Sequence, residues 1–413
     1  MDHSQRRNGL IAQIIAALSS FITPFMLAAI NVALPVISKE LSLDAVTLNW
    51  ISTSYLLSSA VFLLPFGKIA DIYGRKKVFL IGIIIFLISS VFAGFSQNSF
   101  QLISSRILQG FGSSMIFGTG VAILSSIFPP GERGRVIGLN IAAVYLGLTF
   151  GPFLGGLITG HLGWRFIFFF NIPLSLLVIF FIVTKLKGEW AEAKGEKFDI
   201  TGSVIYGVAI ICIIYGMSVL PSLNGFILLG LGIIFLLIFI KVEQKIINPV
   251  LEISLFKNNR VFAFSNLAAL INYSATFSAT FLLSLFLQYG KSLSVQKTGL
   301  ILLVQPVLMS IFSPLTGKIS DKIQPRVLAS TGMAISMIGL VLLIFVSTGT
   351  SITYIIICQL FLGFGFALFS SPNTNAVMSS VEKKSLGIAS ATLSTMRLTG
   401  QMLSMGLATL VFA

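Results

Sequence analysis

Long apolar segments follow one another along almost the whole chain, separated by short stretches that hold most of the charged residues. A helix that crosses a bilayer needs roughly 20 predominantly apolar residues. Thirteen segments meet this requirement, centred near residues 24, 58, 86, 112, 147, 174, 211, 233, 275, 306, 337, 365 and 399. Backbone polar groups in hydrocarbon must be satisfied within the segment, so such runs form helices and not open strands. The pattern predicts an all-α polytopic membrane protein.

The composition excludes a water-soluble protein of this length. Hydrophobic residues occupy 55% of the 413 positions and charged residues 10%, which is more apolar surface than a soluble core hides. The net charge of +14 is spread over short loops and is not gathered on one soluble face, so we expect no nucleic-acid partner. Cys212 and Cys358 lack CxxC spacing, which predicts free thiols and no metal site.

Lys and Arg are divided unevenly between the two sets of loops. With the N-terminus inside the cell, the cytoplasmic loops carry 21 of the 27 basic residues and the opposite loops carry four. Arg106 and Arg397 lie within apolar segments. Basic residues accumulate in cytoplasmic loops, so the distribution predicts a multi-pass protein of the cell membrane with a cytoplasmic N-terminus.

Internal repetition relates the two ends of the chain. The sequence GKIAD at Gly67–Asp71 recurs as GKISD at Gly317–Asp321, and GFG at Gly110–Gly112 recurs at Gly363–Gly365. The offsets, 250 and 253 residues, are nearly equal. Membrane transporters are commonly built from such repeats, so the chain is expected to contain two related halves.

The repeat divides the chain into three parts. We expect an N-terminal six-helix bundle at 1–187, linkers with an inserted helix pair at 188–258, and a five-helix C-terminal bundle at 259–413. Thirteen helices would end the chain on the outside with no basic residue to anchor it. We therefore expect one further helix beyond Ala413.

The loop GKIADIYGRKKV, which begins at Gly67, has a composition suited to a gate between the halves. Gly67 and Gly74 permit close backbone approach and a sharp turn. Asp71 is placed to pair with Arg75 and to face the positive N-terminal end of a neighbouring helix. Asp321 is its counterpart in the second half. Simple anchoring of basic residues at the membrane surface is the alternative, but it gives Asp71 no role.

Three ordered motifs resemble those of the major facilitator superfamily. The loop beginning at Gly67 is similar to its signature between helices two and three, and LISSRILQGFGSS at Leu102–Ser114 to its fourth-helix motif. GLTFGPFLGGLI at Gly147–Ile158 resembles the fifth-helix motif of its antiporters and exporters. Asn31–Pro35, Ser370–Met378 and the inserted helix pair are similar to the fourteen-helix drug:proton antiporter branch. The resemblance covers essentially the whole chain and implies two six-helix bundles with a two-helix insertion.

The fifth-helix motif contains a stripe of small residues. Gly147, Gly151 and Gly155 recur every four positions, with Pro152 and Gly156 beside them. Such spacing lets another helix pack closely. The resemblance implies that this segment seals the outer side when the transporter faces inward. Ordinary small-residue helix packing is the alternative.

Arg106 and Arg397 are candidate functional charges, because a charge inside a membrane span by default faces a cavity or a partner. The resemblance links Arg106 to proton coupling. Either Arg could instead hold helices together through backbone carbonyls. The uncharged candidates for cargo binding are polar residues within the apolar segments: Asn31, Asn272, Tyr273, Gln305, Asn373, Asn375 and Gln401.

The chain departs from the antiporter branch in its acidic residues. All thirteen lie in loops or at segment ends, and Met26 stands where the branch usually has an Asp. Coupling could then use Asp71 or Asp321, protons carried by the cargo, or no ion at all. Without an acidic residue in the cavity, neutral or anionic hydrophobic cargo is favoured over cations.

These features predict a monomeric exporter of hydrophobic small molecules or drugs, driven by proton antiport and needing no cofactor besides a proton gradient. An uncoupled facilitator or importer of a small solute on the same fold is the alternative. The chain has no HExxH, GxSxG or GxxxxGK[ST] motif. Enzymatic chemistry and direct use of ATP are therefore not expected.

Overall fold

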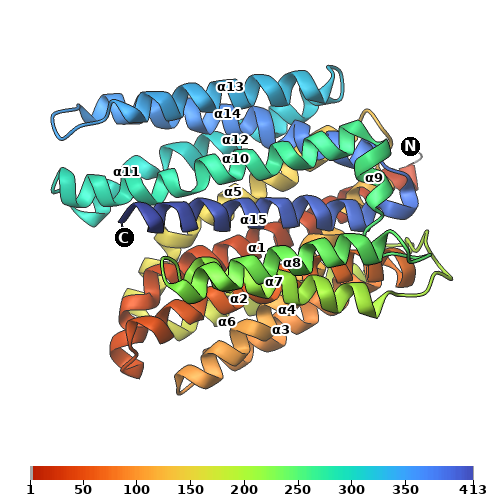
Figure 1. Cartoon of the computed structure of the whole chain (residues 1–413), viewed down its shortest axis with the longest axis horizontal. Coiled ribbons are helices and arrows are strands. Elements are labelled where there is room, and N and C mark those ends of the chain that lie inside the picture. Colours follow the sequence, from red (N-terminus) through yellow and green to blue (C-terminus); the bar gives the residue numbers. More distant parts are fainter. Residues whose placement is uncertain (1–2, 413) are drawn as a thin grey trace.

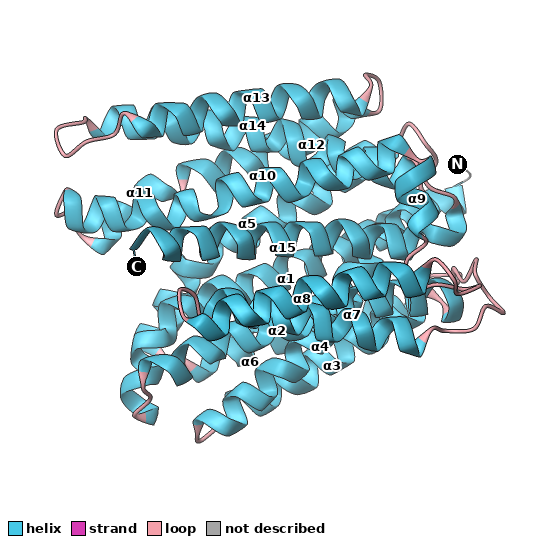
Figure 2. Ribbon diagram, in the orientation of Figure 1, coloured by secondary structure: helices cyan, strands magenta, loops and turns pink. Residues whose placement is uncertain are grey.

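The computed structural model describes residues 3–412, with side chains described except at positions 3, 4, 45, 46, 295, 296, 409, 411 and 412. The described chain is built of helices and turns, and contains no strand (Figure 2). The first half contains α1 (His3–Leu41), α2 (Ala45–Tyr73), α3 (Arg75–Gly94), α4 (Ser99–Ile127), α5 (Arg133–His161) and α6 (Arg165–Thr184). The inserted hairpin consists of α7 (Ile200–Ser218) and α8 (Leu223–Glu243).

The second half is less regular than the first. It contains α9 (Ile253–Asn258), α10 (Arg260–Leu285) with the π-helical extension η1 (Phe286–Gly290), α11 (Val295–Leu302), α12 (Val304–Ser320), α13 (Pro325–Ile344), α14 (Ile352–Ser379), the 3-10 turn η2 (Lys383–Ser385) and α15 (Leu386–Phe412). The segment predicted near residue 306 is thus divided into α11 and α12. The short helix α9 lies in a charged linker where the apolar pattern predicted no helix.

Each predicted segment coincides with helical structure, and the predicted all-α membrane fold is confirmed. Twelve helices among the described residues are long and apolar enough to cross a bilayer. The remaining predicted segment is α15, which is 27 residues long and is not among the twelve. Arg397, Gln401 and several hydroxyl residues lie within this helix.

The helices run between two ends of the molecule. We call the end that holds the turns at 73–75, 127–133, 184–200, 243–260, 320–325 and 379–386 the basic end, and the opposite end the far end. The basic end also holds the start of α1 and the short helix α9 (Figure 1). The loops gather at these two ends because the helices between them span the length of the molecule (Figure 2).

The two halves meet along a seam formed by six helices. α2, α4 and α5 of the first half pack against α12, α14 and α15 of the second. The inserted hairpin lies across this seam, because α7 packs on both α2 and α15. Its buried Tyr206 hydroxyl donates a hydrogen bond to the carbonyl oxygen of Ala60 on α2 at 3.0 Å and lies 3.4 Å from Thr395 Oγ1 on α15. The hairpin therefore contacts both halves at once.

Candidate functional site

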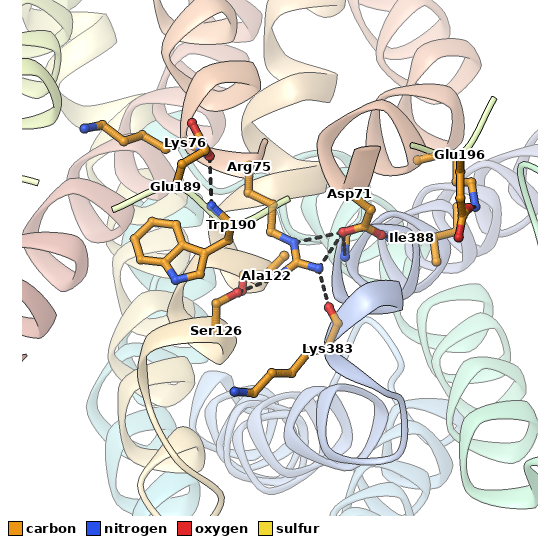
Figure 3. Close-up of polar contacts among 12 residues, drawn as sticks. Asp71, Arg75, Lys76, Ala122, Ser126, Glu189, Trp190, Glu196, Lys383 and Ile388 are labelled. Atoms are coloured by element: carbon orange, nitrogen blue, oxygen red, sulfur yellow. Dashed lines mark hydrogen bonds and ion pairs between the residues drawn. The ribbon is translucent and has the colours of Figure 1, made fainter. Parts of the chain in front are cut away.

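Asp71, in the last turn of α2, joins the first half to the second. Its carboxylate is 1% exposed and accepts hydrogen bonds from the backbone nitrogens of Gly387 and Ile388 at 2.8 and 2.9 Å (Figure 3). These nitrogens lie in the first turn of α15, where backbone N–H groups have no partner within the helix. The carboxylate therefore caps α15 and faces the positive end of its dipole.

Arg75 neutralises this buried carboxylate and extends the network. Its Nε and Nη2 donate to Asp71 Oδ1 at 2.8 and 2.6 Å (Figure 3). The same guanidinium donates to Ser126 Oγ on α4 at 2.7 Å and to the carbonyl oxygen of Lys383 just before α15. Arg75 is fully buried, so every one of its charge-assisted hydrogen bonds is shielded from water.

Asp321, at the end of α12, makes the corresponding contact in the opposite direction. Its Oδ1 and Oδ2 accept from the backbone nitrogens of Gly134 and Arg135 at 2.7 and 3.0 Å, in the first turn of α5. Each half thus provides one aspartate that caps a helix of the other half. We call the α2–α15 contact the first crossing and the α5–α12 contact the second crossing.

Glycines let the backbones approach at both crossings. A Cβ placed on Gly67 would lie 2.5 Å from the Cβ of Ala391 and 2.9 Å from the carbonyl oxygen of Gly387. A Cβ on Gly317 would collide with the carbonyl oxygen of Gly134. Neither position has room for a larger side chain unless the helices separate.

The linker that follows α6 covers the turn between α2 and α3. Gly74 has φ of +114° in this turn, a conformation that favours glycine. Glu189, drawn with Lys76 in Figure 3, accepts from the backbone nitrogen of Lys76 at 2.8 Å. It also accepts from that of Lys77 at 3.1 Å and so caps α3. Glu196 forms an ion pair of 2.6 Å with Lys68. These two glutamates were not predicted, although the charged composition of the linker placed it outside the membrane.

Arg106 lies inside the first half and makes no contact across the seam. Its Nε donates to the carbonyl oxygen of Ile51 at 3.1 Å, its Nη1 donates to Gln109 Oε1, and its guanidinium lies 4.3 Å from the ring centre of Tyr55. The Nη2 atom has no hydrogen-bond partner. Among the described residues, no carboxylate forms an ion pair with it.

Met26 is fully buried beside the hydrophobic core of the first half. Its sulfur accepts a hydrogen bond from Asn171 Nδ2 at 3.1 Å. The position at which the antiporter branch carries an acidic residue is therefore filled here by a neutral side chain that packs within the bundle.

Arg397 lies on α15 beside an aromatic group shared by the two halves. It donates to Thr374 Oγ1, and its guanidinium lies 5.7 Å from the ring centre of Tyr273. Phe366 contacts both Tyr273 and Tyr145, with ring centres 5.0 and 5.9 Å apart. The Nε of Arg397 has no hydrogen-bond partner. Tyr145, on α5, was not predicted, because a lone Tyr in an apolar segment gives no signal.

The other polar candidates do not form one group. Asn373 donates to the carbonyl oxygen of Ser265 at 3.1 Å, and Asn375 donates to Ser320 Oγ at 3.0 Å. Both therefore join helices of the second half. Exposed Asn31 accepts from Ser52 Oγ at 2.8 Å within the first half.

The three remaining polar candidates lie on different helices of the second half. Asn272 and Gln305 are buried on α10 and α12, and Gln401 is half-buried on α15. Gln305 Oε1 lies 3.5 Å from Thr280 Oγ1, whereas Asn272 Oδ1 has no partner.

The glycine stripe of α5 faces α1 of the same half. A Cβ on Gly151 would lie 2.5 Å from the Cβ of Ala28, and a Cβ on Gly155 would lie 2.7 Å from the Cα of Ala29. Gly147 meets the backbone of Phe21. Pro152 is exposed, and Gly156 has only one distant neighbour. The stripe thus brings α1 and α5 into close contact.

A family comparison matches residues 16–405 to the Major Facilitator Superfamily. The chain belongs to this superfamily. The match covers nearly the whole chain, and it agrees with the helical architecture and the paired crossings. The chain is therefore a multi-pass membrane transporter of a small-molecule substrate, and not an enzyme.

The chain is similar to proteins whose names indicate different substrates. The chain is 30% identical over 390 residues to the riboflavin transporter RibZ of Clostridioides difficile, covering 94% of this chain and 84% of that protein. It is 31% identical over 362 residues to multidrug resistance protein 3 of Bacillus subtilis, covering 86% and 70%. It is 30% identical over 400 residues to multidrug resistance protein Stp of Mycobacterium tuberculosis, covering 95% and 74%.

Two solved structures with the same fold have much lower sequence identity to this chain. The human organic anion transporter MFSD10 superposes with a TM-score of 0.71 at 13% identity, covering 100% of this chain and 94% of that one. The proton:xylose symporter XylE gives a TM-score of 0.68 at 15% identity, covering 97% and 88%. At these identities the likeness supports the fold alone.

Proposed function

We propose that this transporter exports hydrophobic small molecules, drugs among them, by proton antiport with alternating access. The observation that carries the proposal is the pair of crossings, in which Asp71 and Asp321 each cap a helix of the other half. Seven hydrogen bonds between the halves, made by Asp71, Arg75, Arg133, Asp321 and Ser390, lie toward the basic end. Such contacts break when the two halves rock apart at this end.

The arrangement corresponds to a transporter closed on the cytoplasmic side. We infer a cytoplasmic N-terminus from the excess of Lys and Arg in the basic-end loops, which places both crossings at the cytoplasmic surface. Asp71, Gly67, Gly74, Arg75 and Asp321 are then the residues of the inner gate. We further propose that the protein works as a monomer in the cell membrane, since both crossings form within one chain.

The group around Arg397 supports neutral or anionic cargo. Its guanidinium carries an unused donor next to Tyr273, and Tyr145 lies across the seam from it. Aromatic faces bind flat apolar molecules, and a positive charge favours an anionic group. The multidrug relatives are consistent with apolar cargo, and the riboflavin transporter with an aromatic one.

An uncoupled facilitator or importer is the second candidate, and one observation favours it. Met26 and Arg106 leave the first half without the acidic partner that the antiporter branch uses. A facilitator needs no protonatable group in its cavity.

Everted vesicles with an imposed pH gradient separate these candidates. We expect acid-inside vesicles with the wild-type protein to concentrate a neutral fluorescent dye such as Nile red, and Arg106→Ala to abolish concentration. Exposed Arg326 on α13 provides the matched control, since Arg326→Ala removes the same charge far from the seam. Equilibration without concentration would support the facilitator instead, and preferential export of ethidium, a permanent cation, would contradict the proposed cargo.

A further inference from the structure

Two buried carboxyl groups meet at the base of the inserted hairpin. Asp199 precedes α7 and Glu243 ends α8, and the side chains are 8% and 2% exposed. Forty-odd residues separate them in sequence, but the hairpin brings them together where the chain enters and leaves it. Neither residue belongs to the crossings or to the group around Arg397.

One oxygen of each carboxyl group is already satisfied. Asp199 Oδ1 accepts from the backbone nitrogen of Gly202 at 2.9 Å, and Glu243 Oε2 accepts from that of Leu251 at 2.9 Å. The other two oxygens, Asp199 Oδ2 and Glu243 Oε1, are buried without a hydrogen-bond partner. A Cβ on Gly202 would collide with both of these atoms, so they converge on one point beside this glycine.

Within the described part of the chain, neither carboxyl group of the pair forms an ion pair. Among the described residues, the ion pairs involve other acids, and Lys68, on the neighbouring α2, is occupied by Glu196. Lys197, Lys241 and Lys245 are near in sequence, but their side chains are exposed. The residues that the structure describes contain no cluster of three or more potential metal ligands.

Apolar side chains pack near the pair, and Glu243 also lines an open hollow together with Glu252 and exposed Lys257. Val250 and Leu251 of the linker after α8 belong to a hydrophobic cluster with Leu64 of α2 and Ile388 of α15. Two charged carboxylates facing each other in such a site repel strongly, and each loses its hydration. One proton between them removes one negative charge and gives both unpartnered oxygens a hydrogen bond.

We propose that Asp199 and Glu243 form a proton-binding site in which the two carboxyl groups share one proton at the base of the inserted hairpin. The proton joins the start of α7 to the end of α8, and these helix ends lead to the first and second halves respectively. The hairpin rests on both halves through Tyr206. Loss of the proton leaves two buried negative charges, which loosens the hairpin from the seam at high pH.

Infrared difference spectroscopy of the purified protein in lipid tests proton binding directly. We expect a protonated carboxyl C=O band at neutral pH that disappears on titration to alkaline pH. The band should be absent in Glu243→Gln and in Asp199→Asn, and unchanged in Glu192→Gln, which alters an exposed acid of the same linker. A wild-type spectrum without such a band at neutral pH would overturn the proposal.

Thermal unfolding provides a second measurement, and it does not require the variants to transport. A shared proton stabilises the folded protein at low pH, and this contribution is lost as the pH rises through the titration of the pair. The wild type should therefore lose apparent melting temperature with rising pH more steeply than Glu243→Gln, whose amide donates a hydrogen bond at every pH. Equal slopes, or stabilisation by Na⁺ in place of H⁺, would refute the shared proton.

Proton binding at this site does not depend on the proposed export function, but its use in coupling does. Vesicles that concentrate dye in the wild type and only equilibrate it in Glu243→Gln would assign coupling to the pair. Normal infrared bands without any gradient-driven transport in the wild type would reject antiport and leave the proton site intact.

Discussion

The first and second crossings have the same plan and different chemistry. At each, an aspartate caps a helix of the other half beside a glycine that allows close backbone contact. Asp71 is buried and paired with Arg75, whereas Asp321 is half-buried and has Pro325 at the position equivalent to that Arg. The first crossing is therefore a neutralised network shielded from water, and the second is a simple helix cap.

The comparison separates two effects. The sequence repeat accounts for the positions at which the halves touch, and burial determines how strongly each contact depends on charge. A helix cap with a charged group contributes about 0.3–1 kcal/mol at an exposed position. Removing one partner of a buried ion pair destabilises a protein by about 3–5 kcal/mol. The two crossings should respond very differently to the removal of charge.

Arg75→Ala is expected to have the largest effect. It leaves the Asp71 carboxylate buried without a counter-charge and should destabilise the closed basic end by about 3–5 kcal/mol. Amide hydrogen exchange should then rise sharply in the first turn of α15 and much less in the first turn of α5. Arg326→Ala is the control for loss of an Arg. Equal exchange in the two turns would contradict the distinction between the crossings.

Alanine in place of the crossing glycines should destabilise the second crossing more than the first, the reverse of the order expected for removal of charge. At Gly317 the new methyl group meets the backbone oxygen of Gly134, whereas at Gly67 its nearest neighbour is the side chain of Ala391. Overpacking costs about 1–3 kcal/mol, and we expect Gly317→Ala to lie at the upper end because its methyl group would lie closer to the Gly134 oxygen than a methyl group at Gly67 would lie to any atom. Melting temperatures of the two variants in detergent measure this. A more stable Gly317→Ala would show that steric contact does not distinguish the crossings.

Asp321→Asn should have a smaller effect than Asp71→Asn. The asparagine keeps one acceptor oxygen for the first turn of α5, so it loses one of the two cap hydrogen bonds and the interaction of the charge with the helix dipole, the latter about 0.3–1 kcal/mol. At the first crossing, the same change also leaves Arg75 without its carboxylate. High salt should reduce the loss of stability caused by Asp321→Asn. It should hardly change the loss caused by Asp71→Asn, because buried pairs are screened less. Equal salt dependence would refute the assigned burial.

Glu189→Gln should have the smallest effect. The amide oxygen still accepts from one of the two backbone nitrogens, and water replaces the lost acceptor at this exposed cap. The main loss is therefore the charge contribution, about 0.3–1 kcal/mol at low salt. Hydrogen exchange at Lys76 and Lys77 should increase slightly, whereas Glu192→Gln should change nothing. A large effect would mean that the linker, and not Arg75, holds the first crossing.

Much of the fold follows from the length of the apolar segments, because lipid leaves helices as the only way to satisfy the backbone. The roles of Asp71 and Asp321 at opposite crossings follow from the repeat, since related halves place equivalent residues at equivalent ends. The sequence alone could not say which helix each aspartate would cap. That depends on the packing of α2 with α15 and of α5 with α12, which connects residues about 190 to 320 positions apart.

The residues that were not predicted are those whose structural role depends on contacts with residues distant in sequence. Asp199 and Glu243 look like ordinary charged residues at helix ends, and only the closure of the hairpin buries them together. Glu189 becomes a cap only because the linker folds back over α3. In each case, a common polar residue acquires its role from a neighbour distant in sequence.

Distance measurement between spin labels tests the central claim, that the halves rock about the seam with the crossings as the inner gate. One pair of labels would replace exposed Lys77 and Lys322 at the basic end, and a second pair would replace Gln97 and Gly349 at the far end, in a background without Cys212 and Cys358. We predict that Asp71→Asn lengthens the basic-end distance and shortens the far-end distance. Distances that stay fixed at both ends, in this variant and under a pH gradient with transported dye, would contradict the account.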